Sequence, residues 1–194
     1  MSLNISIGIL AGGKSTRMGS DKALMQIGNE RFIERIIKEL DHYSEIIISA
    51  GKNTSYEELG FKTVYDENTR VGPMEGIRQI LKAAKEEYVF ICAVDMPFVS
   101  RDIVDHILGY VSSDYDCYVM THEEKIEPLC AVYRKNAFTV IDELISEKRY
   151  RLREIFSLLP TRYIPMEGTS LNEKVLRNIN TKEDFYEALN DSMF

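Results

Sequence analysis

Short apolar runs alternate along this chain with segments of helical periodicity, and this alternation constrains the fold more than any other feature. The apolar runs that we expect to form buried strands are residues 5–10, 45–50, 61–65 and 88–94. The amphipathic segments between them, expected as helices, are residues 31–40, 73–84 and 102–111, the last with Ser100 as its N-cap. This order predicts an α/β fold of three layers, in which helices cover both faces of a mostly parallel, Rossmann-like sheet. In such sheets a ligand binds beyond the carboxyl ends of the strands.

The second half of the chain is expected to add antiparallel strands. Residues 115–120 and 128–133 have strand character, and the polar segment Thr121 to Glu127 between them predicts the turn of a hairpin. Thr181 and Asp184 have the spacing of a capping box, which predicts the start of the last helix. The remaining expected elements are helices at residues 137–145 and 152–158 and a strand at residues 162–164. We interpret residues 1–194 as a single domain.

Composition excludes several classes of protein. The formal net charge of -7 argues against a protein that coats nucleic acid. No apolar run is long enough to span a bilayer, and the first residues carry no basic leader, so we expect a cytoplasmic protein without a membrane partner. Cys92, Cys117 and Cys130 are widely spaced and form no C-x-x-C pair, which predicts reduced core residues.

The segment after the first predicted strand is rich in glycine and cations. Residues 10–22 are L-A-G-G-K-S-T-R-M-G-S-D-K. Gly12 and Gly13 have no side chains, so their backbone N–H groups can approach phosphate oxygens. Lys14, Arg17 and Lys22 supply positive charge within the same segment, and Arg can bind phosphate through two hydrogen bonds. The segment therefore predicts a phosphate-binding loop.

A competing motif overlaps this loop. Residues 8–15 match G-x-x-x-x-G-K-[ST], the phosphate loop of P-loop NTPases, and Asp95 after an apolar run resembles their second motif. Residues 9–12 are apolar, however, and are better explained as a strand. Residues 18–21, M-G-S-D, would interrupt the helix that follows a P-loop lysine. A P-loop kinase or GTP-binding module therefore stays a minor alternative.

Two aspartates follow predicted strands at the same edge of the sheet. Asp95 ends the most apolar strand, where a carboxylate can hold Mg²⁺ against phosphate oxygens. Pro97 is expected to keep the chain extended past this point. Asp66 follows the strand at 61–65 and is a candidate acceptor of hydrogen bonds from a base or ribose, although an Asp that forms a turn explains the same position.

Together these segments resemble the bacterial molybdenum cofactor guanylyltransferases over most of the chain. Residues 10–24 resemble the signature L-A-G-G-x-S-x-R-M-G-x-D-K-A-L, and residues 94–98 its strand-end D-M-P-F. Residues 72–77 are similar to G-P-L-x-G-I, and residues 128–133 to P-L-x-A-V-Y. Residues 178–184 resemble N-I-N-T-P-E-D, with Lys182 in place of proline.

The resemblance implies a fold of the nucleotide-diphospho-sugar transferase type, with a nucleotide-binding half (1–100) and an acceptor-side half (101–194). It implies transfer of GMP from GTP to the terminal phosphate of molybdopterin or Mo-molybdopterin, with release of pyrophosphate. Transient contact with cofactor-biosynthesis proteins or recipient apoenzymes is also compatible with it. The residues alone do not separate guanine from cytosine, so a molybdopterin cytidylyltransferase stays open as the main alternative.

The resemblance also implies roles for individual residues. The residues expected to bind GTP are Leu10, Ala11, Gly12, Gly13, Lys22, Asp66 and Asp95. The expected catalytic residues are Lys22, Arg17 and Asp95, and Asp95 is the expected Mg²⁺ ligand. Asn178 and Asn180 are candidates for the acceptor side, although Asn180 could instead cap the last helix.

A basic cluster lies outside these motifs. Its members are Lys148, Arg149, Arg151 and Arg153. Such a cluster can receive an acceptor phosphate or a partner protein, but we favour the solvated start of a helix.

Overall fold

A computed structural model of the chain describes residues 4–12, 22–51, 56–68, 70–171 and 173–191. The seven strands of its main sheet are β1 (Ile5–Leu10), β4 (Glu45–Ser49), β5 (Lys62–Val64), β6 (Tyr88–Ala93), β7 (Cys117–His122), β8 (Lys125–Arg134) and β9 (Thr161–Pro165). The α-helices are α1 (Phe32–Leu40), α2 (Pro73–Ala83), α3 (Arg101–Leu108), α4 (Ala137–Ser146), α5 (Arg153–Leu158) and α6 (Lys182–Asp191). A small hairpin and three short 3₁₀ helices complete the described elements: β2 (Gln26–Ile27), β3 (Glu30–Arg31), η1 (Lys22–Leu24), η2 (Glu57–Leu59) and η3 (Glu173–Leu176).

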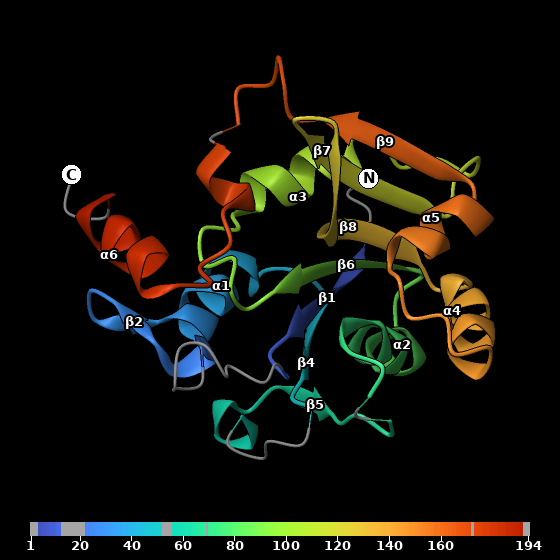
Figure 1. The fold of residues 1–194 in the computed structure, drawn as a ribbon, viewed down its shortest axis with the longest axis horizontal. Coiled ribbons are helices and arrows are strands. Elements are labelled where there is room, and N and C mark those ends of the chain that lie inside the picture. Colours follow the sequence, from blue (N-terminus) through green and yellow to red (C-terminus); the bar gives the residue numbers. More distant parts are fainter. Residues whose placement is uncertain (1–3, 13–21, 52–55, 69, 172, 192–194) are drawn as a thin grey trace.

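The strand order of the main sheet is β5-β4-β1-β6-β8-β7-β9 (Figure 1). Strands β5, β4, β1 and β6 are parallel neighbours. Strand β8 is antiparallel to both β6 and β7, and β9 pairs parallel with β7. Six strands therefore run in one direction and β8 alone reverses, which confirms the mostly parallel sheet predicted from the sequence.

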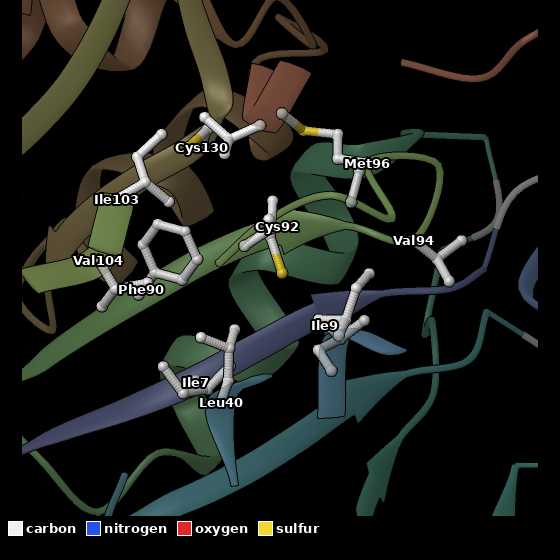
Figure 2. Packing of buried hydrophobic residues seen from close by; sticks show 14 of the residues in the cluster. Ile7, Ile9, Leu40, Phe90, Cys92, Val94, Met96, Ile103, Val104 and Cys130 are labelled. Atoms are coloured by element: carbon white, nitrogen blue, oxygen red, sulfur yellow. The ribbon is translucent and has the colours of Figure 1, made fainter. Parts of the chain in front are cut away.

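Side chains alternate between the two faces of the sheet, as the period of a strand requires. On one face, Ile7 and Ile9 of β1 and Phe90 of β6 are buried under α1 and α3, as Figure 2 shows. On the other face, α2, α4 and α5 cover Val89 and Ile91 of β6. The helices on both faces make the three layers that the alternation predicted (Figure 1).

Gly8 explains how closely helix α2 packs on the centre of the sheet. A Cβ added there would lie 2.6 Å from Cδ1 of Ile91 and 2.7 Å from Cγ2 of Ile80. This glycine therefore makes room for α2 in the core. It is the third residue from the end of β1, inside the ladder to β4 and β6.

The hairpin of the second half is tighter than expected. Its turn is Glu123-Glu124 alone, because Thr121 pairs with Ile126 and His122 with Lys125. Both glutamates have positive φ, 48° and 63°, the geometry of a two-residue turn that follows the strand twist. The predicted turn from Thr121 to Glu127 was too long, because polar residues at the end of a hairpin can pair as well as turn.

Other expectations about local structure are confirmed or refined. The three cysteines are free and buried. Ser100 lies at the N-cap position of α3, but its side chain makes no capping hydrogen bond. Within the described part of the chain, no helix combines the length and apolar content needed to cross a membrane.

Candidate functional site

The first strand ends between two neighbours at the carboxyl edge of the sheet. The amide of Ala11 donates to the carbonyl of Ser49 at 2.8 Å, and the amide of Val94 donates to the carbonyl of Leu10 at 3.0 Å. These bonds extend the pairing of β1 with β4 and β6 by one residue on each side. Leu10 and Ala11 are thereby held beside the segment that carries Asp95.

Gly12 passes very close to the chain that leaves β4. A Cβ on Gly12 would lie 2.3 Å from the backbone nitrogen of Gly51, and Gly51 has φ +61°. Neither position can take a side chain without movement of the backbone. Gly12 is also exposed, so its backbone faces solvent at this edge.

The structure describes only the beginning and the end of the predicted phosphate loop. Gly13 and Arg17 lie outside the described residues. Lys22 begins the 3₁₀ helix η1, but its side chain is not described. The expected contacts of these three residues with phosphate thus stay predictions.

Asp95 lies in a turn at the end of β6. The amide of Met96 donates to the carbonyl of Ala93 at 3.0 Å, and a second turn follows because Val99 donates to Met96 at 3.1 Å. The expectation that Pro97 keeps the chain extended was therefore wrong: proline restricts Met96, but it also suits the second position of the next turn. Val94 and Met96 are buried in the core (Figure 2), whereas Asp95 is partly exposed.

The segment with Asn178 and Asn180 lies directly against Asp95. Ile179, which is fully buried between these asparagines, donates its amide to the carbonyl of Asp95 at 2.8 Å. Residues 178–180 and 95 are more than eighty positions apart in the sequence, and the structure brings them together.

Thr181, and not Asn180, provides the side-chain cap of the last helix. The amide of Asp184 donates to Oγ1 of Thr181 at 3.1 Å, and the amide of Thr181 donates back to Asp184 at 2.8 Å. This confirms the capping box. The backbone amides of Asn180 and Thr181 and the Thr181 hydroxyl hold the pKa of Asp184 below its ordinary value. The side chain of Asn180, which is exposed, is not needed for the cap.

Asp66 is attached to the same edge through Gly51. Its amide donates to the carbonyl of Gly51 at 2.8 Å, and its side chain is partly exposed. The turn after it uses a neighbouring side chain, because Oδ1 of Asn68 accepts from the amide of Arg70 at 3.3 Å. Asp66, Gly51 and Gly12 therefore form a continuous line of backbone contacts.

Sequence reasoning missed two residues that shape this edge. Tyr56 is buried and donates its hydroxyl to the carbonyl of Ala11 at 3.4 Å. Gly51 makes the close contact with Gly12. A glycine just after an apolar strand was a visible signal for Gly51, whereas nothing in the sequence around Tyr56 indicated its partner. Gly76 lies in the G-P-M-E-G-I segment, and a Cβ there would meet Leu10 Cδ2 at 2.6 Å.

A register shift shapes the part of the edge beyond Asp95. Val119 pairs with Ala131 and Met120 with Glu127, so β8 has extra residues between these pairs. The buried hydroxyl of Tyr133 donates to the carbonyl of Pro128 at 2.7 Å. Bulges of this kind bend a strand and often lie beside active sites. The P-L-C-A-V-Y segment is therefore closed on itself, because the side chain of its last residue, Tyr133, bonds to the backbone of its first, Pro128.

The strand position of Gly8 argues against the P-loop alternative. Gly8 would be the first glycine of that motif, yet it lies within β1 and its missing Cβ serves packing against α2. Ile9 and Leu10 continue the strand, so their amides pair with neighbouring strands.

The thiols offer no reactive nucleophile. Burial raises the pKa of Cys92 and Cys130 above that of an ordinary thiol, and raises the pKa of Cys117 to about 12. All three are fully buried and stay protonated near neutral pH.

The donor set fits a magnesium ion that is shared with a substrate. Among the described residues, no group of three or more His, Cys, Asp or Glu side chains could hold a metal by itself. Mg²⁺ commonly takes one or two carboxylates and completes its shell with water and phosphate oxygens. The single carboxylate of Asp95 suits such a site and does not suit a structural zinc site.

The basic cluster has acidic neighbours of its own. Arg149 forms ion pairs with Glu147 at 2.9 Å and with Glu154 at 2.6 Å. Arg153 begins α5, and Lys148, Arg149, Arg151 and Arg153 are exposed. This arrangement fits the favoured interpretation as a solvated helix start.

Comparison with known proteins identifies the family. The model of the MobA-like NTP transferase domain matches residues 7–163. A protein of Clostridium perfringens named probable molybdenum cofactor guanylyltransferase is 36% identical over 190 residues, which cover 95% of this chain and 96% of that protein. A protein of the same name from Carboxydothermus hydrogenoformans is 31% identical over 189 residues, covering 96% of this chain and 95% of the other.

Solved structures agree on the fold. Molybdopterin-guanine dinucleotide biosynthesis protein A from Archaeoglobus fulgidus superposes with a TM-score of 0.83 at 22% identity, covering 97% of this chain and 98% of that one. The 2-C-methyl-D-erythritol 4-phosphate cytidylyltransferase from Thermus thermophilus superposes with a TM-score of 0.72 at 16% identity, covering 99% and 100%. The nucleotide-diphospho-sugar transferase type of fold is confirmed, and the chain belongs to the MobA-like NTP transferase family.

Proposed function

We propose that this protein transfers GMP from GTP to the terminal phosphate of molybdopterin or Mo-molybdopterin, releasing pyrophosphate and forming the molybdopterin guanine dinucleotide cofactor. The observation that carries this proposal is the carboxyl edge of the sheet, where Gly12 packs against Gly51, Leu10 bonds to Val94 beside Asp95, and Ile179 bonds to Asp95. Relatives that match nearly the whole chain are named for this reaction.

The reaction needs little acid–base chemistry from the protein. A phosphate oxygen of the acceptor attacks the α-phosphorus of GTP, the bond to the β-phosphate oxygen breaks, and pyrophosphate leaves with that electron pair. The acceptor phosphate is already an anion near neutral pH, so no strong general base is required. This fits a described edge whose cysteines are buried and protonated. The main barrier is repulsion between two anions.

The donor side of the site would neutralise part of that repulsion. Leu10, Ala11, Gly12 and Gly13 would bind GTP through their backbone, and Lys22 and Arg17 would bind its phosphates. The backbone of Gly12 is exposed at the edge, which supports this role. Asp66 would accept hydrogen bonds from the nucleoside.

Asp95 would hold Mg²⁺ between donor and acceptor. When bound, the ion would polarise phosphate oxygens and stabilise charge on the leaving pyrophosphate. The turn after β6 and the buried side chains on both sides of Asp95 hold its backbone in place. Preorganised charge of this kind costs no rearrangement during the reaction.

Asn178 and Asn180 would line the acceptor side. Both asparagines flank Ile179, whose amide is bonded to the carbonyl of Asp95. Their side-chain amides can donate hydrogen bonds to an acceptor phosphate without adding charge. We also expect the enzyme to work in the cytoplasm, in transient contact with cofactor-biosynthesis proteins or recipient apoenzymes and without nucleic acid or membrane.

Pyrophosphate release from purified protein tests the proposal. We expect release from GTP in the presence of Mg²⁺ and molybdopterin, and little release without the acceptor or with CTP or ATP. Preference for CTP would transfer the assignment to a cytidylyltransferase. Release of orthophosphate instead of pyrophosphate would remove the chain from nucleotidyl transfer.

A further inference from the structure

A buried carboxylate near the start of helix α2 contacts the segment that carries Asp66. Glu75 is 0% exposed. Its Oε1 accepts a hydrogen bond from the backbone amide of Glu67, the residue after Asp66, at 3.1 Å. The amide of Asp66 itself is bonded to the carbonyl of Gly51. The backbone amides of Asp66 and Glu67 are therefore both held, the first by Gly51 after β4 and the second by Glu75 of α2.

Glu75 is ionised, and both of its carboxylate oxygens accept hydrogen bonds. Arg78 donates from Nε to Oε2 at 3.1 Å and from Nη2 to Oε1 at 2.9 Å, the two-point contact that guanidinium and carboxylate favour. Gln79 donates from Nε2 to Oε1 at 2.8 Å. Burial alone would raise the pKa of Glu75, but the hydrogen bonds and charge of Arg78, with Gln79 and the Glu67 amide, hold it below its ordinary value.

Arg78 connects this carboxylate to two further acids. Its Nη2 lies 2.5 Å from Glu67 Oε2, and its Nη1 lies 3.0 Å from Asp142 Oδ1 on helix α4. Arg78 and Lys82 together lower the pKa of Glu67 to about 2. Glu67 is thus attached by its backbone to Glu75 and by its side chain to Arg78, and Asp142 is a further partner of Arg78.

A buried ion pair of this kind is costly to desolvate, and a pair of apolar side chains would often fill the space with equal or greater stability. This pair differs from a purely structural one because both of its members contact Glu67, the residue next to Asp66: Glu75 binds the backbone amide of Glu67 and Arg78 binds its side chain. We propose that Glu75 and Arg78 are positioning residues, which hold Asp66 at the distance from Gly51 and Gly12 that the nucleoside of GTP requires. This inference rests on the proposed function, in which Asp66 contacts the nucleoside.

The substitution Glu75→Gln tests the inference with almost no change of shape. A glutamine has one acceptor oxygen and one donor nitrogen, whereas both oxygens of Glu75 accept. One orientation sets the new NH₂ against Nε of Arg78, and the other sets it against the amide of Glu67. The first orientation loses the bond from Arg78 Nε, the second loses the three bonds that Oε1 accepts, and in both the charge that Arg78 faces disappears.

The decisive measurement is GTP affinity in a double-mutant cycle with Asp66→Ala, by calorimetry in the presence of Mg²⁺. We expect Glu75→Gln to weaken GTP binding about tenfold in the wild-type background, equivalent to about 1.4 kcal/mol. In the Asp66→Ala background it should have no further effect, because residues that act through one contact are not additive. An additive effect, or an unchanged affinity in the single variant, would overturn the inference.

Matched controls separate positioning from general stability. Asp142→Asn removes another partner of Arg78 that does not contact Glu67, so GTP affinity should stay at the wild-type value. A loss in this variant equal to that of Glu75→Gln would show that the effect does not depend on a contact with Glu67, which contradicts the inference. If Glu75→Gln does not fold, Arg78→Lys removes the two-point contact and keeps the charge, and the same cycle applies. Failure of the wild-type protein to bind GTP would instead reject the proposed function.

Discussion

The two sides of the carboxyl edge are built by different physical means. On the proposed donor side, at the ends of β1, β4 and β5, backbone segments pass one another so closely that Gly12 and Gly51 exclude a Cβ. On the proposed acceptor side, beyond Asp95, specific hydrogen bonds hold the chain: a long-range bond from Ile179 to Asp95, and a local bond from the Tyr133 side chain to Pro128 across the bulge. The donor side therefore depends on absent side chains, and the acceptor side on particular bonds.

This difference predicts how each side tolerates substitution. A triphosphate is recognised largely by backbone N–H groups and cations, which need close approach, so added volume is the main threat on the donor side. An acceptor-binding surface needs only that its segments keep their place. Asp95 lies between these two sides, and a substitution there is expected to affect both.

The largest effect is expected at that boundary. Asp95→Asn keeps the size and removes the charge, so Mg²⁺ would lose its carboxylate. A metal ion contributes several kcal/mol to charge stabilisation, and each 1.4 kcal/mol is tenfold, so turnover should fall about 10³-fold or more. This loss is measured as the rate of pyrophosphate release at increasing Mg²⁺ concentrations. Thermal unfolding of the variant controls for damage to the fold. Near-normal turnover, or wild-type activity that survives EDTA, would contradict the metal assignment.

The next effect tests the cations of the donor side. Lys22→Ala should slow turnover about 10²- to 10³-fold, by analogy with the loss of one preorganised donor. Lys38→Ala is the matched control, since this exposed lysine on α1 forms its ion pair with Glu30 and lies outside the proposed site. Equal rates in the two variants would remove Lys22 from the mechanism.

A pair of glycine variants tests the role of backbone contact. Gly12→Ala places a Cβ 2.3 Å from the backbone nitrogen of Gly51, so the backbone must move. Overpacking of this kind costs ~1–3 kcal/mol, and KM for GTP should therefore rise about tenfold. The nearest atoms to a Cβ in Gly8→Ala are side-chain methyl groups of Ile91 and Ile80, so this variant should lower the free energy of unfolding by ~1–3 kcal/mol and leave KM unchanged. Loss of GTP binding by a folded Gly8→Ala protein would instead restore the P-loop interpretation.

The smallest effect concerns the acceptor side. Tyr133→Phe removes the hydroxyl that bonds to the Pro128 carbonyl, with an expected cost of ~1–3 kcal/mol in unfolding free energy. KM for molybdopterin should rise and KM for GTP should stay constant. Tyr118→Phe is the control, because its hydroxyl bonds to the carbonyl of Ser112. Ser112 also accepts from Tyr88 at the start of β6, whereas Asp95 follows the end of that strand. If both variants change KM for the acceptor alike, the bulge has no special role.

Much of the fold was predictable from local pattern. The strand from Ile5 to Leu10 and the helix that starts at Pro73 agree with the structure at these boundaries, because periodic burial and a proline in the first turn are local signals. The turn after Asp95 and the two-residue hairpin turn at Glu123-Glu124 were missed, since both depend on which backbone groups find partners.

The sequence by itself determined the layers, the mostly parallel sheet, the capping box at Thr181 and the order of the motifs, because these follow from the spacing of residues near one another in the chain. Only the tertiary structure decided that Ile179 bonds to Asp95, that the backbones of Gly12 and Gly51 pass in close contact, and that Glu75 binds the amide of the residue after Asp66. These contacts join residues far apart in sequence or depend on the path of the backbone. Their energies arise only after the sheet has brought the partners together, so no local pattern encodes them.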